Sequence, residues 1–111
     1  MAFKRLGKIE LIDTNFQTLY TVPGGKYAII SSIHFVNVSD SIDNTIMAAH
    51  HDNGVVWEDY ILYKEPLWVQ GGANHVSIQL GICMSAGEKI TVKTYAAGNV
   101  AVQIWGEEGD A

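Results

Sequence analysis

The feature that most constrains this chain is a two-residue alternation of apolar and polar side chains, interrupted at short intervals by turn residues. Val76, Ile78, Leu80 and Ile82 alternate with polar or small residues, which is the pattern of a β-strand with one buried face. No stretch shows the 3.6-residue apolar period of an amphipathic helix. Strand-like segments recur near residues 8–12, 17–22, 27–38, 45–51, 55–62, 67–70, 76–82, 89–95 and 99–105.

Eight or nine short strands at this spacing are typical of an all-β fold, a two-sheet antiparallel β-sandwich, and we expect the jelly-roll type. The last third, with turns at 85–88 and 96–99, predicts three consecutive antiparallel strands. The segment 27–38 is apolar on both faces, so we expect core on one side and a loop or neighbouring subunit on the other. Pro66 cannot donate a backbone hydrogen bond, which favours a sheet edge there.

Length and composition predict one domain that makes contacts with other proteins. With 111 residues, the chain is expected to be a single sandwich domain, residues 1–111, with a short N-terminal arm at about residues 1–8. Hydrophobic residues make up 48% of the chain and charged residues only 17%, which leaves uncharged surface suited to subunit contacts. The net charge of −5 disfavours nucleic acid as a partner, because phosphate contacts need clustered Lys and Arg.

Three observations bear on the compartment in which the chain folds. No apolar run reaches the roughly 18 residues of a membrane-spanning helix, so no membrane partner is expected. The N-terminal segment lacks the long apolar core of a signal peptide. Cys83 is the single cysteine, so no intrachain disulfide can form, and we expect folding in a reducing cytoplasm.

The adjacent His50 and His51 suggest two interpretations, a metal site or a hairpin. Asn53-Gly54 is a strong signal for a type I′ turn, in which both central residues take positive φ. Such a turn places His50 opposite Trp57 on the next strand and leaves His51 half-exposed on the other face. Because neighbouring residues of a strand point to opposite faces, the two imidazoles cannot bind one ion, and we predict a hairpin.

Other polar sets are better explained by structure than by chemistry. Oxygen ligands for calcium occur in or near loops, but without the spacing of a calcium loop, and the residues concerned are Asp40, Asp43, Asn44 and Asp52. Cys83 with His34 or His75 would make a nucleophile and base, yet Cys83 ends an apolar strand, where a lone cysteine is usually an inert hydrophobe. Glu58 and Asp59 are adjacent and would point apart. We expect no enzyme, no catalytic residue, no metal and no cofactor.

Aromatic residues are the remaining candidates for binding, and they are Trp57, Tyr60, Tyr63, Trp68 and Trp105. Such side chains line sugar-binding platforms and protein interfaces, or they pack in the core. For Tyr60 and Trp105 we expect core packing, whereas Trp68 is the best candidate for exposed contact. A carbohydrate-binding module, with Trp57, Tyr63 and Trp68 stacking on a glycan, is therefore an alternative of another class, although it is not favoured.

Three stretches together resemble a known group of proteins: TLYTVPGGKYAIISSIHFVNVSD, YKEPLWVQGGANHVSIQLGICMSAGEKITV and GNVAVQIWGEE. They are similar to small all-β phage virion structural proteins with an LYTVPxGK signature, which include capsid decoration (cement) and tail or fibre-associated proteins. The resemblance covers about residues 6–108. It implies a non-enzymatic bacteriophage virion protein, folded in the cytoplasm of the bacterial host before assembly.

Within that group, a decoration protein that stabilises the head through protein–protein contacts is our first hypothesis, and a tail, neck or fibre component is the alternative. The partners implied are further copies of the chain, as a homo-oligomer, and other virion proteins such as the major capsid protein. We expect the contacts in two loops, Thr21–Lys26 and Leu67–Ala73, with residues 2–8 reaching a neighbour. The candidate interface residues are Thr21, Val22, Pro23, Lys26, Leu67, Trp68 and Val69.

Overall fold

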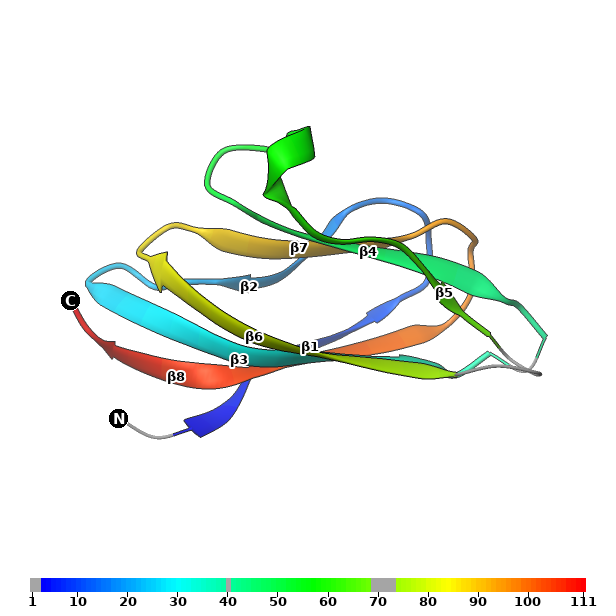
Figure 1. Ribbon diagram of the computed structural model, residues 1–111, viewed down its shortest axis with the longest axis horizontal. Helices are drawn as coiled ribbons and strands as arrows, with labels where there is room; N and C mark the ends of the chain where they lie inside the picture. Colours follow the sequence, from blue (N-terminus) through cyan, green and yellow to red (C-terminus); the bar gives the residue numbers. More distant parts are fainter. Residues whose placement is uncertain (1–2, 40, 69–73) are drawn as a thin grey trace.

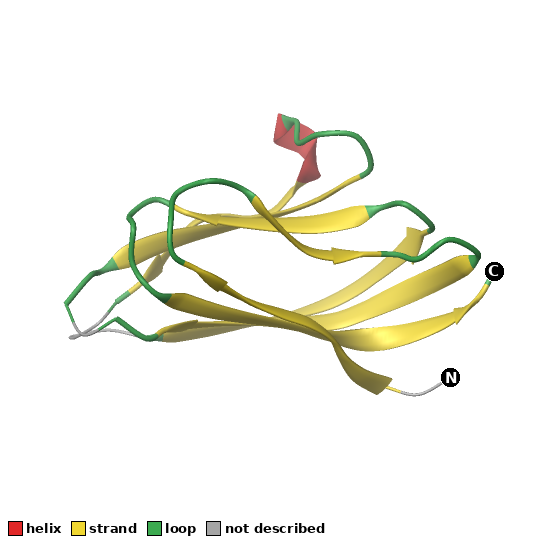
Figure 2. Ribbon diagram, turned by 180° about the vertical axis from the view of Figure 1, so that it is seen from behind, coloured by secondary structure: helices red, strands yellow, loops and turns green. Residues whose placement is uncertain are grey.

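Two antiparallel four-stranded sheets lie face to face in the computed structural model, which describes residues 3–39, 41–68 and 74–111 (Figure 1). The strands are β1 (Phe3–Leu11), β2 (Gln17–Thr21), β3 (Lys26–Asn37), β4 (Asn44–His51), β5 (Tyr60–Leu67), β6 (His75–Ser85), β7 (Lys89–Thr94) and β8 (Val100–Asp110). A short 3-10 turn, η1 (Trp57–Asp59), stands above the second sheet, and the view from behind shows the two layers again (Figure 2). None of the described helical segments is long and apolar enough to cross a membrane.

The strand order identifies a jelly roll. One sheet has the order β1-β8-β3-β6 and the other has the order β2-β7-β4-β5. The pairs β1–β8, β2–β7, β3–β6 and β4–β5 are nested, so that a long antiparallel ribbon is wound on itself. This is the arrangement of two interlocked Greek keys. The predicted all-β class and two-sheet jelly-roll sandwich are confirmed.

Two predictions about neighbouring strands need correction. The last third forms the three consecutive strands that were predicted, but they do not pair with one another, because β6 and β8 belong to one sheet and β7 to the other. In place of the predicted segment 55–62 the structure has β5, which begins at Tyr60 and continues through Pro66 to Leu67. Residues 69 and 70 of the predicted segment 67–70 lie outside the described residues. Strand β5 lies at the edge of its sheet, as the proline predicted, so the missing N–H costs no internal sheet hydrogen bond.

The N-terminal residues are part of the sheet. Most of the expected arm belongs to β1, which pairs with β8 from Phe3, opposite Glu107, to Leu11, opposite Val100. A register shift between Arg5 and Gly7 bends this edge strand without ending its pairing. Residues 3–8 are therefore held along their length by a ladder of backbone hydrogen bonds.

The core lies between the sheets and is built from alternate residues of the central strands. Ile33 and Phe35 of β3 and Val102 and Ile104 of β8 have no exposed surface. Each such side chain contributes roughly 1.5–3 kcal/mol through removal of its apolar surface from water. The residue after Phe35, Val36, is 38% exposed on the outer face, as the alternation predicts. Ile30 was expected on the face of Val36, but it is fully buried, because a register shift between Ile30 and Ser32 changes the alternation.

Candidate functional site: the interaction surfaces of the sandwich

The predicted interface residues divide into buried and exposed members. Val22 and Leu67 are in the core, with 1% and 0% exposure, so they support their loops from beneath. Thr21 and Pro23 are exposed. The exposed members also include Trp68, while Lys26 is partly exposed, and Val69 lies outside the described residues. The Nζ of Lys26 contacts the Oδ1 of Asp110 at 2.9 Å, an ion pair close to the C-terminus.

The described parts of the two predicted contact loops, Thr21–Lys26 and Leu67–Trp68, lie at opposite ends of the molecule, and residues 69–73 lie outside the described residues. Lys26 begins β3, whereas Asn37 ends it and donates from Nδ2 to the carbonyl of Leu67 at 3.1 Å. The twelve residues of β3 run along a molecule whose longest extent is 44 Å. The described parts of the two loops therefore cannot form one continuous contact surface.

One end of the sandwich exposes a cluster of apolar side chains, which we call the apolar tip: Ile12, Val38, Ile42 and Trp68. Their exposed fractions are 58%, 50%, 38% and 42%. A depression of about 530 Å³ lies here, and its walls include Ile12, Val38, Ile42 and Gly98. The segments 12–16, 38–43 and 95–99, which form this end (to the right in Figure 1), contain no Lys or Arg. Sequence reasoning found Trp68 here but missed the other three, because it placed Ile12 and Val38 at the ends of the predicted strands 8–12 and 27–38 and Ile42 in a polar loop.

Two buried asparagines shape the apolar tip. Asn37 donates from Nδ2 to the carbonyls of Ile42 at 2.8 Å and Leu67 at 3.1 Å, which joins two loops. Asn44 accepts from the backbone N–H of Ala96 at 3.0 Å and donates to its carbonyl at 2.8 Å. Both asparagines are only 6% exposed, and bonds to buried backbone groups are costly to lose. The tip is therefore held in a defined shape.

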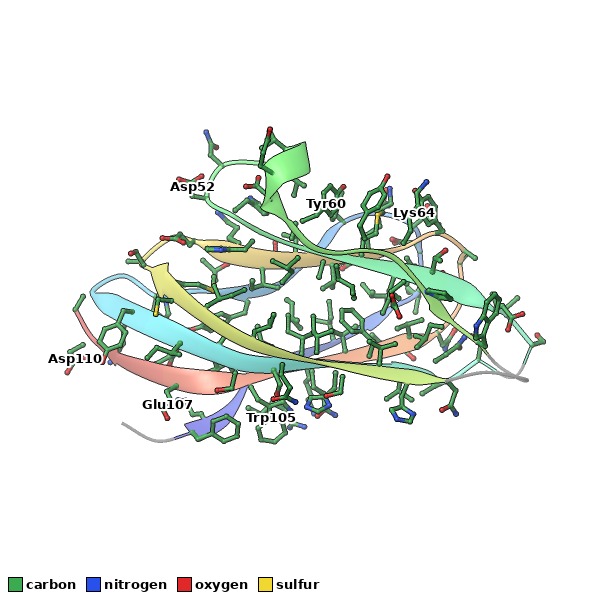
Figure 3. The ribbon with its side chains drawn as sticks, in the orientation of Figure 1. Asp52, Tyr60, Lys64, Trp105, Glu107 and Asp110 are labelled. Carbon is green, nitrogen blue, oxygen red and sulfur yellow. The ribbon has the colours of Figure 1, made fainter. Side chains whose placement is uncertain are left out.

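A second surface lies on the outer face of the β2-β7-β4-β5 sheet, and we call it the aromatic patch: Phe16, Tyr60, Tyr63 and Tyr95, with Lys64 and Lys93. The rings of Tyr60 and Tyr63 are 5.0 Å apart, edge to face. The Nζ of Lys64 lies 5.4 Å from the ring centres of both Tyr63 and Tyr95. Tyr60 was expected in the core, but it lies on the outer side of this sheet, as does Lys64 (Figure 3).

A bulge in β5 presents the centre of this patch. Ile46 pairs with Glu65 and Ala48 pairs with Leu62, so Tyr63 and Lys64 together oppose one residue of β4. Lys64 has φ of +54°, a left-handed conformation that is uncommon outside glycine. A hydrogen bond with Tyr95 is the main cause of a raised pKa for Lys64. The lysine is thus held charged among aromatic rings.

The residues of the predicted glycan platform are not brought together. Tyr63 lies in the aromatic patch, whereas Trp68 lies at the apolar tip, five residues and roughly 16 Å further along an extended chain. Trp57 is in η1, and its side chain is outside the described part of the structure. Tyr63 and Trp68 therefore belong to two different surfaces.

Trp105 was predicted to pack in the core, and this prediction is wrong. Ile104 points inward, so its neighbour Trp105 points outward from the β1-β8-β3-β6 sheet (Figure 3). The indole stacks on Phe3, with ring centres 6.1 Å apart. It borders a shallow depression of about 310 Å³ whose other walls include His34 and Gln103.

The two histidines of β4 make separate hydrogen bonds, although both border one depression of about 400 Å³. The Nε2 of His50 lies 2.5 Å from Oε1 of Glu88. An ionised carboxylate can only accept a hydrogen bond, so the imidazole is the donor. The Nδ1 of His51 accepts the backbone N–H of Gly54 at 3.0 Å. Within residues 3–39, 41–68 and 74–111, no group of three or more His, Cys, Asp or Glu side chains is arranged to hold a metal ion.

The predicted type I′ turn and the His50–Trp57 pair are wrong. Of the two central residues only Gly54 takes positive φ, at +99°, and residues 52–59 separate β4 from β5. His50 instead pairs with Ile90 of β7. Local hydrogen bonds explain the longer loop, since the carboxylate of Asp59 accepts the backbone N–H of Val56 at 2.9 Å and closes η1.

The remaining polar candidates do not converge. Cys83 is exposed rather than buried, on the outer face of β6 opposite Ile29. His34 contacts Ser32 at 3.3 Å and His75 contacts Asn74 at 3.2 Å, so the described contacts bring neither imidazole to the thiol.

The predicted oxygen ligands for calcium are also separated. Asn44 uses its side-chain oxygen on backbone N–H groups at the apolar tip. Asp52 follows β4 at the opposite end of the sandwich. The Nζ of Lys89 lies 3.4 Å from the backbone carbonyl oxygen of Asp52. Asp40 lies outside the described residues.

Glu88 is expected to make the stability pH-dependent in acid. The hydrogen bond from His50, helped by the backbone N–H of Ser85 at 3.0 Å, lowers the pKa of Glu88 below its ordinary value of 4.5. Because the pKa of Glu88 is lower in the folded than in the unfolded state, its ionised carboxylate stabilises the fold. This stabilisation is complete above pH 4.5, the unfolded-state value, and is lost as the pH falls through the folded-state pKa. Urea unfolding of the wild type and of Glu88→Gln checks this, and the wild type should lose its advantage below that pH. A stability difference that stays constant with pH would contradict it.

Comparison with known proteins adds information on the fold. The sequence matches no protein-family model and no curated protein. In structure the chain is similar to a chain of the acidic stable capsid structure of Helicobacter pylori bacteriophage KHP30. The TM-score is 0.57 at 11% identity, over 99% of this chain and 100% of that chain. The two chains therefore share one fold from end to end.

Weaker likenesses include a chain of the cyanophage Pam1 capsid asymmetric unit, with a TM-score of 0.47 at 14% identity over 94% of this chain and 83% of that chain. Another is the nucleoplasmin-like N-terminal domain of Drosophila FKBP39, with a TM-score of 0.43 at 11% identity over 98% of this chain and 91% of that chain.

Proposed function

We propose that this protein is a non-enzymatic structural component of a bacteriophage virion, a decoration (cement) protein bound to the outside of the head. The observation that carries the proposal is the end-to-end likeness to a chain of the KHP30 phage capsid structure. A two-sheet jelly roll fits a building block that acts through its surface. The resemblance of the sequence to small phage virion proteins points the same way.

The surfaces of the molecule support binding rather than chemistry. The described contacts of His34 and His75 are with Ser32 and Asn74, and neither imidazole contacts the thiol of Cys83. The apolar tip offers four exposed apolar residues on loops that buried asparagines hold in shape. A protein that binds only the assembled shell shifts the assembly equilibrium toward it by mass action. We assign the shell contact to the apolar tip, with the major capsid protein as partner.

Immunogold labelling of virus particles, with an antibody raised against this chain, tests the location. Gold over the heads is expected. Gold confined to the tail or its tip would replace the decoration role by a tail, neck or fibre role. Absence of label, with the antibody shown to recognise the purified protein, would overturn the virion assignment.

Acidic substitutions at the apolar tip are expected to abolish binding to particles. Ile12→Asp combined with Val38→Asp places two charges on side chains that are 58% and 50% exposed, so the fold should be retained. Burying these charges against a shell would cost several kcal/mol, enough to reduce affinity more than 100-fold. Co-sedimentation with purified particles measures the effect.

Val56→Asp is the matched control for the tip, because Val56 is 57% exposed in the loop between β4 and β5, at the other end of the molecule. This variant should bind particles like the wild type. Equal losses for the tip and control variants, or no loss for either, would remove the tip from the proposal.

Glycan binding is the second candidate, and the aromatic patch favours it. Tyr63 and Tyr95 are 43% and 45% exposed on one face, as stacking on sugar rings requires. Binding to a glycan array that Tyr63→Ala abolishes would support this function. Particle binding without any glycan affinity would support the decoration role.

A further inference from the structure

The strand β6 is an edge strand without the usual protection. It is the outer strand of the β1-β8-β3-β6 sheet, and among the described residues it pairs only with β3. Its eleven residues, HVSIQLGICMS, contain no charge and no proline. Exposed edges normally carry charges or proline, because their free N–H and C=O groups are a template for pairing with another chain.

The other three edge strands carry such protection or are short. The edge β1 contains Lys4, Arg5, Lys8 and Glu10. The edge β5 contains Lys64, Glu65 and Pro66, and its bulge takes a left-handed residue. The edge β2 has only five residues. Register shifts occur at all four edges, so bulges do not distinguish them. Charge and length single out β6.

The inward face of β6 is also left incomplete. Val76, Ile78, Leu80 and Ile82 pack on the core but are only partly buried, whereas Ile33 of the neighbouring β3 is fully buried. A further strand beside β6 would cover the apolar side chains and bond the free backbone groups at the same time. The occupant must therefore be an extended, uncharged strand with its own apolar face.

A second copy of β6 meets these requirements. In a sheet continued across a two-fold axis, paired residues must lie on the same face, so the axis passes through a residue position and not between two. With the axis centred on Leu80, the middle residue of β6, all eleven residues of the strand are paired. The inward pairs are then Val76–Met84, Ile78–Ile82 and Leu80–Leu80, and the outward pairs are His75–Ser85, Ser77–Cys83 and Gln79–Gly81. Every inward pair is apolar, and no charge meets a like charge.

We propose that two copies of this protein associate through β6, antiparallel and centred on Leu80, to form one continuous eight-stranded sheet. The inference does not depend on the proposed virion role, because it concerns the purified protein alone. It gives the expected homo-oligomer a two-fold contact at a named strand, which begins just after the predicted contact loop Leu67–Ala73.

A cysteine cross-link tests the pairing and its register. Ser77→Cys places a thiol opposite the native Cys83 of the second copy, and mild oxidation should give a covalent dimer on a non-reducing gel. The two residues are six positions apart on one strand, roughly 20 Å, so they cannot join within a chain. The control Ser77→Cys with Cys83→Ser should give no covalent dimer on the same gel. Absence of the dimer in the first variant, or its presence in the control, would overturn the register.

A charge pair tests the same contact without covalent chemistry. Gln79 and Gly81 are exposed and face each other across the proposed axis, and Gly81 has open space at its Cβ position. Gln79→Lys with Gly81→Lys should give monomers, whereas Gln79→Lys with Gly81→Glu should give dimers, as measured by sedimentation at increasing concentration. Equal behaviour of the two variants, or a monomeric wild type at every concentration, would overturn the proposal. Particle binding by either variant tests the proposed function separately.

Discussion

Replacing Phe35 with alanine is expected to lower the free energy of unfolding by about 4 kcal/mol. Phe35 is the largest fully buried side chain of the described residues, and it lies near the end of β3 between Val76 of β6 and Val102 of β8. Truncation removes its apolar surface and leaves a cavity that two rigid sheets cannot close. Urea unfolding monitored by circular dichroism measures the loss.

The neighbouring Val36 provides the control for this substitution. It is 38% exposed on the outer face, so Val36→Ala should cost less than about 1 kcal/mol. Comparable losses at both positions would show that the in–out alternation of β3 is not the one described here.

Replacing Gly106 with alanine is expected to destabilise the fold by about 3 kcal/mol. A Cβ atom at this position would lie 2.2 Å from the carbonyl oxygen of Ile29 and 3.1 Å from the Cα of Ile30. These are backbone atoms of β3, next to the register shift between Ile30 and Ser32, so the strand itself would have to move. Thermal unfolding by calorimetry is the measurement.

Gly24→Ala is the matched control for Gly106→Ala. No heavy atom lies within 4 Å of a Cβ built at Gly24, and the glycine does not have positive φ. This variant should unfold like the wild type or slightly later, because alanine restricts the unfolded chain. A melting temperature for Gly106→Ala that equals that of the control would contradict the close approach of β3 and β8.

The errors in the sequence-based assignments have two physical causes. Trp105 was assigned to the core because of its size, although the inward Ile104 beside it already required an outward indole. The Asn53-Gly54 turn was assigned from local turn chemistry, but His51 and Asp59 bond to the loop backbone and stabilise a longer connection. In the first case strand parity outweighs hydrophobicity, and in the second side-chain hydrogen bonds outweigh the turn preference.

The candidate surfaces were less accessible to sequence reasoning than the fold. Ile12 and Val38 are isolated apolar residues in separate loops, and no pattern along the chain joins them. They become one surface because β1, β3 and β7 all end at the same end of the sandwich. By contrast, Trp68 was recognised as exposed from its position just after Pro66 at a sheet edge.

The sequence by itself determined which residues of β6 and β8 alternate between two faces and where turns interrupt them. Alternation follows from the backbone geometry of a single strand, so it can be read locally. Only the tertiary structure decided that β7 lies in the opposite sheet from β6 and β8, and that β6 is an unprotected edge. Pairing joins residues far apart in the chain, as Lys4 and Gly106 are, and it depends on how all the strands satisfy their faces and edges together.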